Sequence, residues 1–368
     1  MIITQSEGGG LRRHLTDLVD ALDEKGYQIL FVLNYNFADK TFIAWSRLPH
    51  ENTQFINLTT FDRKINFLSD FKTLIKVIQL IRRFHPDVVH THSSKAGVIG
   101  RIAAKLTGVK LIFYTPHAYS FLSSEFSENK KKLFIIIEKM LSKYATTMTF
   151  NVSDSERNIA LKYNIDIPSK LVTIFNGIPD LKKNYRLESR KKLHFLENET
   201  VIGTVARLSA QKNPLFFIDI ARSMETKYPD YKIFFCWMGG GDLKSVYEGQ
   251  LPKNIRFLGE KEESDKLIFA YDAYISTSIF EGFSYSLLEA ARAHLPVLLS
   301  SVPGNIDFSR LYSQGSYLFS LNQSADSVAD LIVDLHRRHI LNGKHSEYSV
   351  TFSYDDMVKK IESFYNKS

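Results

Sequence analysis

The sequence predicts an α/β protein made of two doubly wound units, each a parallel sheet wrapped by helices. The first observation is a strand–turn–helix rhythm that runs through residues 1–178. The second is that this rhythm restarts after a polar stretch at residues 179–200. The third is length, because 368 residues exceed what one hydrophobic core ordinarily supports. We therefore expect domains at residues 1–178 and 201–353, a linker between them, and a terminal helix at 354–368.

In the first unit, a short strand at MIITQS precedes a segment whose leucine and valine side chains between residues 11 and 22 share one helical face. The runs GYQILFVLN, PDVVHTHS and KLIFYTPH read as buried strands, and a helix ends near Lys105. In the second unit, helices are expected from Pro214 and after Ser284. Its predicted strands are VIGTVA, YKIFFCWM, NIRFLG, YDAYISTS and LPVLLS.

Composition is that of a globular protein from a reducing compartment. Hydrophobic residues make up 44% and charged residues 24% of the chain, and no apolar run approaches the roughly 20 residues that span a bilayer. The start MIITQSEGGG lacks the layout of a signal peptide. The single cysteine, Cys236, excludes an internal disulfide. We therefore expect a cytoplasmic protein.

The formal net charge of +7 is compatible with nucleic acid, an anionic membrane or a phosphorylated small molecule as partner. No nucleic-acid module signature is visible, so no nucleic-acid partner is expected. Many basic residues alternate with apolar ones on predicted helices, as in ENKKKLFIIIEKMLSKYA. Such a segment is either a solvated helix face or a membrane-surface patch, and both interpretations stay open at this point.

Doubly wound sheets bind ligands at the carboxyl ends of their strands, so site residues are expected there. The first strand end is EGGGLRRH, where Gly8, Gly9 and Gly10 permit close backbone approach. The helix that follows would offer free N–H groups to an anion. A plain tight turn explains the triplet equally well, and the stretch matches neither a Walker A loop nor G-x-G-x-x-G.

The strand end GTVARLSAQKNP carries two cations, Arg207 and Lys212. Asn213 is a plausible N-cap, with Pro214 at the first helical position. An arginine fork and a lysine point charge beside a helix start suit a diphosphate. Two solvated surface cations are the alternative interpretation.

Two glutamates bracket the stretch EGFSYSLLE directly after an apolar strand. With Ser284 as N-cap and Phe283 stapled against Leu288, Glu281 lies on the loop and Glu289 about a turn into the helix. Carboxylates accept hydrogen bonds from vicinal sugar hydroxyls. One ring at each glutamate, with a diphosphate at the helix start between them, would describe a sugar nucleotide. Alternatively, Glu281 is a capping partner and Glu289 a solvated side chain.

Arg207, Lys212 and the Glu281-x7-Glu289 pair together resemble the retaining glycosyltransferases of family 4. Further resemblance lies in GGGLRRHLTDLVDAL, PDVVHTHSSKAGVIGRIAAKLTGVKLIFYTPHAYSF, NVSDSERN, IFNGIP, FEGFSYSLLEA and PVLLSSVPGNIDF, so it spans nearly the whole chain. The resemblance implies the GT-B fold, in which two Rossmann-like domains face each other across a cleft. It also implies that the C-terminal helix crosses back to the N-terminal domain.

The resemblance implies specific roles for these residues. Arg207 and Lys212 would hold the donor diphosphate, Glu281 the transferred sugar, and Glu289 the ribose. Backbone groups beside Glu281 would also contact the donor, and other glycine loops would line the base or close over the diphosphate. The backbone contacts expected on this basis are Gly9, Gly10, Gly240, Gly259, Gly282, Phe283 and Ser284.

By the same resemblance, His117 would approach the donor sugar as a catalytic residue, although a histidine ending a strand can simply cap local backbone. His90 and His92 are expected to be structural or supporting. Their H-x-H spacing suggests a metal site, but the sequence shows no third or fourth ligand nearby. The Asp-x-Asp motif of metal-dependent transferases is absent from the chain. No metal or other cofactor is therefore expected.

Three positions depart from the family pattern. Ala118 follows the histidine where glycine is common, and Pro179 replaces an acidic residue after NGI. His294 occupies a helix-ending position that is commonly glycine, where a left-handed backbone is expected.

The function implied is transfer of a hexosyl or N-acetylhexosaminyl unit, with retention, from a nucleotide sugar (a UDP-sugar by default) to a lipid-linked saccharide in bacterial surface polysaccharide synthesis. The acceptor would be a saccharide linked to polyprenyl diphosphate, or another saccharide. Lys130–Lys132, beside Leu133, Phe134 and Ile136, would dock the enzyme peripherally on the anionic inner face of the plasma membrane. The alternatives are a UDP-sugar 2-epimerase and a non-catalytic scaffold partner.

Overall fold

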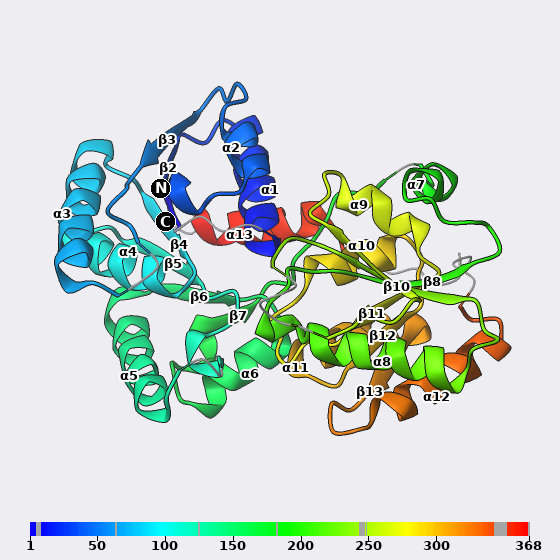
Figure 1. Ribbon diagram of the computed structural model, residues 1–368. Coiled ribbons are helices and arrows are strands. Elements are labelled where there is room, and N and C mark those ends of the chain that lie inside the picture. The colour runs from blue at the N-terminus through cyan, green and yellow to red at the C-terminus, as the bar shows by residue number, and fades with distance from the viewer. Residues whose placement is uncertain are drawn as a thin grey trace. The chain divides into compact units, whose positions relative to one another are not determined.

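The computed structural model describes residues 1–4, 9–62, 65–123, 126–181, 183–242, 247, 249–341 and 352–366. The chain divides into two compact units (Figure 1): Met1–Gly177 together with Tyr354–Ser368, and Ile178–Ser353. Each unit is a parallel sheet with helices on its faces. The predicted α/β class with two doubly wound domains is confirmed.

The first unit is built on a seven-stranded sheet in which all neighbouring strands run parallel. Strand order reverses between β1 and β4, and such a switch point opens a crevice at the carboxyl ends of the strands. In spatial order the strands are β3 (Thr53–Asn57), β2 (Ile29–Leu33), β1 (Ile2–Ile3), β4 (Val88–His92), β5 (Leu111–Thr115), β6 (Met148–Asn151) and β7 (Leu171–Thr173).

Alternating side chains of β2 divide the first unit into two cores. Phe31 packs with side chains of α1 (Gly10–Glu24), α2 (Lys40–Ser46) and α13 (Tyr354–Tyr365). Val32, on the opposite face, packs with α3 (Phe67–Phe84) and α4 (Ser94–Leu106). The remaining helices are α5 (Glu128–Ala145), which contacts α4, and α6 (Asp154–Lys162).

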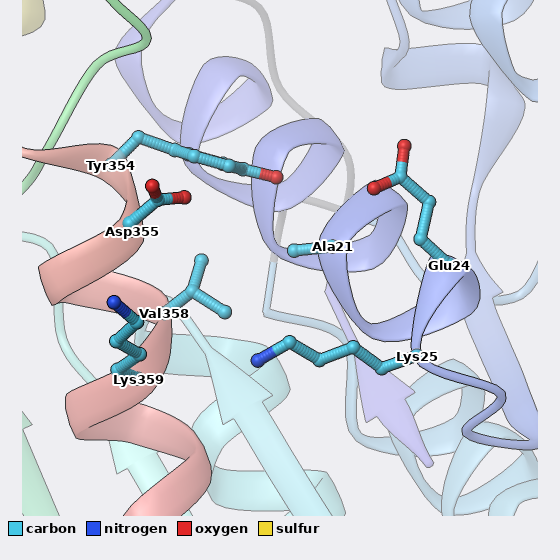
Figure 2. A pocket seen from close by; sticks show the side chains of 7 residues that line it. All are labelled: Ala21, Glu24, Lys25, Tyr354, Asp355, Val358 and Lys359. Atoms are coloured by element: carbon cyan, nitrogen blue, oxygen red, sulfur yellow. The ribbon is translucent and has the colours of Figure 1, made fainter.

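The C-terminal helix α13 belongs to the first unit, as expected. Met357, Val358 and Ile361 are buried in the same core as α1. The Tyr354 hydroxyl donates to the Asp17 carbonyl at 2.9 Å. Figure 2 shows a small pocket of about 220 Å³ between α1 and α13, lined by Ala21, Glu24, Lys25, Tyr354, Asp355, Val358 and Lys359. The helix therefore returns to the unit in which the chain began.

The second unit has a six-stranded parallel sheet whose order reverses between β8 and β11. Its strands, in spatial order, are β10 (Ile255–Gly259), β9 (Ile233–Met238), β8 (Thr200–Val205), β11 (Ala273–Ser276), β12 (Val297–Ser300) and β13 (Ser316–Phe319). Its helices are α7 (Arg186–Lys192), α8 (Pro214–Lys227), α9 (Ser264–Leu267), α10 (Tyr285–Arg292), α11 (Pro303–Leu311) and α12 (Ala325–Arg337). Fully buried strand residues such as Trp237 and Ile275 form its core.

Residues 179–200, which we expected to be a linker, lie within the second unit. Helix α7 in this stretch places Arg186 and Arg190 on the buried carboxylate of Asp272, at 2.5 and 3.0 Å. These two arginines are paired within the unit, whereas Lys183, Glu188 and Lys191 in the same stretch are exposed. The chain passes from one unit to the other directly after Gly177 and again before Tyr354.

No helix among the described residues is both long enough and apolar enough to cross a membrane.

Candidate functional site

In the second unit, the loop after β8 carries both predicted cations. A short 3-10 turn (Ala210–Lys212) leads to Asn213, which has a left-handed backbone. The Asn213 side chain accepts from the Phe216 N–H at 3.4 Å, and Pro214 is the first residue of α8. The predicted N-cap is therefore confirmed. It turns the chain so that Lys212 lies beside the end of β11.

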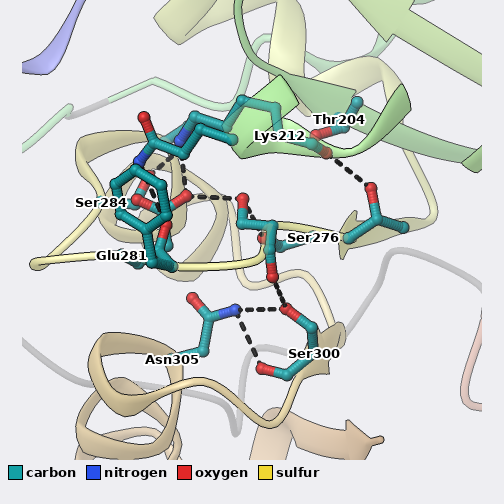
Figure 3. A network of polar contacts seen from close by, with 12 residues as sticks. Thr204, Lys212, Ser276, Glu281, Ser284, Ser300 and Asn305 are labelled. Carbon is teal, nitrogen blue, oxygen red and sulfur yellow. Dashed lines mark hydrogen bonds and ion pairs between the residues drawn. The ribbon is translucent and has the colours of Figure 1, made fainter. Parts of the chain in front are cut away.

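Glu281 and Lys212 form an ion pair at the strand ends, with 2.5 Å between Nζ and Oε1. The Ser278 hydroxyl donates to the same carboxylate oxygen at 2.6 Å. The Glu281 side chain is only 7% exposed, and the ion pair with Lys212 offsets the free-energy cost of removing its carboxylate from water. Figure 3 shows the contact and the hydroxyls around it. Glu281 is thus a partner of Lys212 and not of a helix terminus.

A second layer of polar groups supports the loop that carries Glu281. The Ser300 hydroxyl donates to the Ser278 carbonyl at 2.6 Å, and the Asn305 amide donates to the Ser300 carbonyl at 3.0 Å (Figure 3). Ser278, Ser300 and Asn305 are all buried. Sequence reasoning missed these three residues. The signal that could have indicated two of them is a serine at or just after the end of a buried strand, as Ser278 is after β11 and Ser300 at the end of β12.

Gly304 on α11 is a further residue that sequence reasoning missed. A Cβ there would lie 2.2 Å from the Gly282 carbonyl oxygen and 2.6 Å from that of Glu281. Both are backbone atoms and cannot move aside as a flexible side chain would. The absence of a side chain at Gly304 therefore lets α11 support the backbone of the predicted donor loop.

Helix α10 begins after Ser284, as predicted, with Phe283 and Leu288 buried beside it. Ser284 does not accept a capping hydrogen bond from the helix, and its hydroxyl lies 3.0 Å from that of Ser286. Glu289 lies within α10 and is buried. The alternative of a solvated Glu289 is therefore excluded. In its first turn, the Leu287 and Leu288 N–H groups donate to the Ser284 carbonyl at 3.2 and 3.4 Å. The positive end of the α10 dipole lies at this turn.

The predicted glycine contacts lie in two places. Gly240 and Gly259 follow β9 and end β10, and Gly259 has a left-handed backbone with φ of 67°. In the first unit, Gly9 precedes α1 with φ of 72°, and Gly10 is the first residue of that helix. Gly8 lies outside the described residues.

His117 follows β5 on a turn with an unusual backbone. Its φ is 54° and that of Ala118 is 78°, a region that glycine adopts most easily. The Ala118 N–H donates to the buried carboxylate of Glu156 at 2.6 Å, and the Val152 N–H donates to its other oxygen at 2.7 Å. Burial raises the pKa of Glu156 to about 7. Glu156, missed by sequence reasoning, holds the turn that presents His117.

Three imidazoles meet at this edge of the first sheet. His92 Nδ1 lies 3.1 Å from His117 Nε2, and the His14 ring packs edge-on against His117 with 4.7 Å between centroids. Asn176 Oδ1 lies 3.2 Å from His14 Nδ1. Burial lowers the pKa of His14 to about 4 and that of His92 and His117 well below the usual value. All three rings are therefore neutral near pH 7.

No third ligand beside the H-x-H pair was visible in the sequence, and the structure groups different histidines together. One ligand atom each from His14, His92 and His117 lies within 4.8 Å of the others, so the three could hold a metal ion. His90 instead contacts the Tyr365 hydroxyl at 2.5 Å and the Thr115 hydroxyl at 2.8 Å. His90 is thus part of the packing against α13, as expected of a structural residue.

The predicted residues are therefore divided between the two units, and within the second unit Lys212 contacts Glu281 while the Arg207 side chain is exposed. Arg207, Lys212, Glu281 and Glu289 belong to strand ends and helix starts of the second unit, and His117 and the Gly9 turn to the first. His294, predicted to need a left-handed backbone, has φ of 55°. Pro179 accepts a hydrogen bond from Arg292 through its carbonyl at 2.8 Å, a contact that no side chain at position 179 affects.

Comparison with known proteins agrees with this arrangement. Residues 8–180 match the model of Glycosyltransferase Family 4, and residues 186–349 match that of Glycosyl transferases group 1. The chain is 31% identical over 326 residues to the UDP-Gal:alpha-D-GlcNAc-diphosphoundecaprenol alpha-1,3-galactosyltransferase of Escherichia coli, covering 83% of this chain and 82% of that one. It is 30% identical over 238 residues to the O-antigen biosynthesis glycosyltransferase WbnH of Escherichia coli, covering 64% of each.

Among solved structures, Anabaena Alr3699/HepE in complex with UDP and glucose superposes with a TM-score of 0.78, over 98% of this chain and 97% of that one. Its sequence identity is 19%, so this likeness concerns the fold. The sequence similarity to the Escherichia coli galactosyltransferase extends through both units. The chain therefore belongs to glycosyltransferase family 4.

Proposed function

We propose that this glycosyltransferase moves a hexosyl or N-acetylhexosaminyl unit, with retention, from a UDP-sugar to a lipid-linked saccharide in bacterial surface polysaccharide synthesis. The observation that carries the proposal is the Lys212–Glu281 pair beside the start of α10. It places a cation, a hydroxyl-binding carboxylate and the positive end of a helix dipole at one strand-end loop. A sugar attached to a diphosphate needs these three kinds of contact.

Lys212 has two tasks in this proposal. Without donor, its ammonium neutralises Glu281. With donor bound, Lys212 and Arg207 face the diphosphate and stabilise the negative charge that grows as the nucleoside diphosphate leaves. Glu281 then accepts hydrogen bonds from hydroxyls of the transferred sugar, and Ser278 keeps its carboxylate in place. Glu289 binds the ribose from within α10.

In the first unit, His117 approaches the reacting sugar. Its ring is neutral near pH 7 because burial lowers its pKa, so it can accept or donate a hydrogen bond without adding charge. His92 and His14 hold that ring in place. No side chain in the proposal forms a covalent intermediate, so positioning and leaving-group electrostatics supply the rate.

We also propose that transfer needs no metal. The test is transfer in the presence of a strong chelator, followed by addition of Mg²⁺, Mn²⁺ or Zn²⁺. The rate should persist in chelator and should not rise with Mg²⁺ or Mn²⁺. A loss that one ion restores would assign that ion to the enzyme, with His14, His92 and His117 as the first ligands to examine.

Helix α5 supports docking on an anionic membrane. Its exposed side chains include Leu133, Ile136, Met140 and Tyr144, at helical spacings of three and four. Lys130 and Lys132 are exposed beside them. Phe134, expected to be part of this surface, packs instead against Phe126, with 5.1 Å between ring centroids. The replacement K130E/K132E should weaken binding to anionic vesicles in flotation. Equal binding by the variant and the parent chain would remove α5 from the docking surface.

The donor is identified by thermal shift against a panel of UDP-, GDP- and dTDP-sugars, followed by transfer assays with the donors that stabilise the chain. The galactosyltransferase relative makes UDP-galactose the first donor, and an undecaprenyl-diphosphate-linked N-acetylglucosamine the first acceptor. NMR of the product reports whether the anomeric configuration is retained. Interconversion of UDP-sugars without transfer would favour an epimerase, and donor binding without any turnover would favour a scaffold.

A further inference from the structure

Helix α3 exposes large apolar side chains on the face that turns away from its sheet. Phe67, Leu68, Phe71 and Ile75 are 87%, 77%, 61% and 40% exposed. Val77 and Ile81, on another face of the helix, are buried in the core of the first unit. Clustered apolar side chains of this size are uncommon on the surface of a monomer and mark a place of interaction.

The four side chains form one stripe, which we call the α3 patch. Phe67, Phe71 and Ile75 follow one another at intervals of four, and Leu68 precedes Ile75 by seven, so all four lie within about a third of the helix circumference. The helix start that carries them is well formed. Asn66 accepts from the Ser69 N–H at 3.1 Å, and the Ser69 hydroxyl bonds the Thr60 carbonyl at 2.7 Å.

The charge of α3 is strongly positive. Lys72, Lys76, Arg82 and Arg83 are exposed along the helix. Its one acidic residue, Asp70, is paired with Lys95 of α4 at 2.5 Å. On the helix circumference, Lys72 lies about 40° from Leu68 on one side of the apolar stripe, and Lys76 lies about 40° further round. An apolar stripe bordered by unneutralised cations is complementary to a surface that is anionic outside and apolar just beneath.

We propose that the α3 patch inserts into the headgroup region of an anionic lipid bilayer while its lysines and arginines contact the lipid phosphates. This inference adds a second contact surface to the membrane docking proposed above, and it rests on that proposed function. A bilayer fits better than a protein groove, because exposed Lys72 and Lys76 flank the apolar stripe on one side and Arg82 and Arg83 extend the positive charge along the helix. The core-facing side of α3 keeps the helix in the first unit, so insertion stays shallow.

The α3 patch and α5 belong to the same helical layer. Helix α4 contacts both α3 and α5. Val32 and Ile112 pack under α3 and α4, and Tyr114, two residues along β5 and therefore on the same face as Ile112, packs under α5. One membrane can therefore meet both helices, each of which exposes apolar side chains beside lysines.

The test is flotation of the full chain with vesicles of phosphatidylcholine alone or with 30% phosphatidylglycerol, in physiological salt. The insertion variant is F67S/L68S/F71S. The matched control is L187S/L196S, which removes two side chains that are 74% and 63% exposed in the second unit. The insertion variant should bind anionic vesicles at least about tenfold more weakly, since each buried apolar side chain contributes to partitioning. The control should bind as the parent does.

Two further measurements separate the electrostatic contribution from the apolar one, and membrane binding from transfer activity. K72E/K76E should weaken binding about tenfold or more on anionic vesicles and not change it on neutral ones. Transfer to a short-chain, water-soluble acceptor should be equal in the insertion variant and the parent, which keeps failure of the patch distinct from failure of the proposed function. Parent-like flotation of F67S/L68S/F71S would overturn the proposal. So would a concentration-dependent dimer of the parent that this variant abolishes, because the patch would then cover a second copy of the chain.

Discussion

The strand ends of the two units carry opposite kinds of polar chemistry on similar parallel sheets. In the second unit, a full ion pair of Lys212 and Glu281 stands between β8 and β11. In the first unit, the edge next to β1 and β4 carries three imidazoles that burial keeps neutral. The difference suits a division of labour in which one unit neutralises a charged donor and the other positions groups without adding charge. Four predictions address this division.

The largest effect is expected for Glu281→Ala. Removing the carboxylate should lower the transfer rate about 10²- to 10³-fold, as loss of a preorganised polar contact at a reacting centre does. Binding of the nucleoside diphosphate, measured calorimetrically, should persist because Lys212 and Arg207 remain. Glu289→Ala is the comparison variant, which should weaken nucleotide binding instead. Transfer at the parent rate by Glu281→Ala would show that the charged loop is not the donor site.

His117→Asn should lower the transfer rate about 10- to 100-fold with little change in donor affinity. Asparagine tolerates the left-handed backbone found at this position. His339→Asn is a matched control, because His339 is exposed and has a similar φ of 57°. Equal rates for the two variants would remove the histidine cluster from the reaction.

The pH dependence of stability should differ between the units. The folded pKa of His14 is about 4, below the roughly 6.5 of an unfolded chain. Between these values the unfolded state takes up a proton that the folded state excludes. The contribution of His14 to the free energy of unfolding is therefore largest above about pH 6.5. It decreases by about 3 kcal/mol as the pH falls towards 4.

Hydrogen exchange on the whole chain measures this difference region by region. Between pH 7 and pH 5, amides of α1 and β4 should lose more protection against opening than those of β8 and β11, once intrinsic exchange rates are taken into account. His14→Gln should reduce the loss in the first unit. Equal losses in the two units would contradict the neutral, buried state of the histidines.

The smallest effect concerns backbone strain. Each unit has a non-glycine residue with a left-handed backbone, Ala118 beside His117 in the first and His294 after α10 in the second. Ala118 and His294 have φ of 78° and 55°, where an L side chain costs about 1–2 kcal/mol. Replacement by glycine removes that cost but frees the unfolded chain, so each glycine variant should gain about 0.5 kcal/mol of stability. Chemical denaturation would measure it. A loss of stability in Ala118→Gly would mean that the methyl group packs favourably in the turn.

Local sequence patterns predicted much of the fold and some of the contacts at the candidate site. Period-two strands and period-3.6 helices placed α1, β5 and α10 within a residue or two, because each pattern depends on neighbouring residues. Glu281 was recognisable because a carboxylate directly after an apolar strand requires a partner. The polar stretch at 179–200 was misread as a linker because Arg186 and Arg190 find their partner, Asp272, some eighty residues away.

The sequence by itself determined the alternation of strands and helices, the strand ends where polar side chains collect, and the positions that need a left-handed backbone. These follow from the steric and hydrophobic preferences of short segments. Only the tertiary structure decided which strand ends meet. It joined His14 to His92 and His117, set Glu156 under the turn at Ala118, and brought Gly304 against the backbone of Glu281 and Gly282. Such contacts depend on strand order and crossover geometry, which bring distant segments together and leave no periodic trace in the sequence.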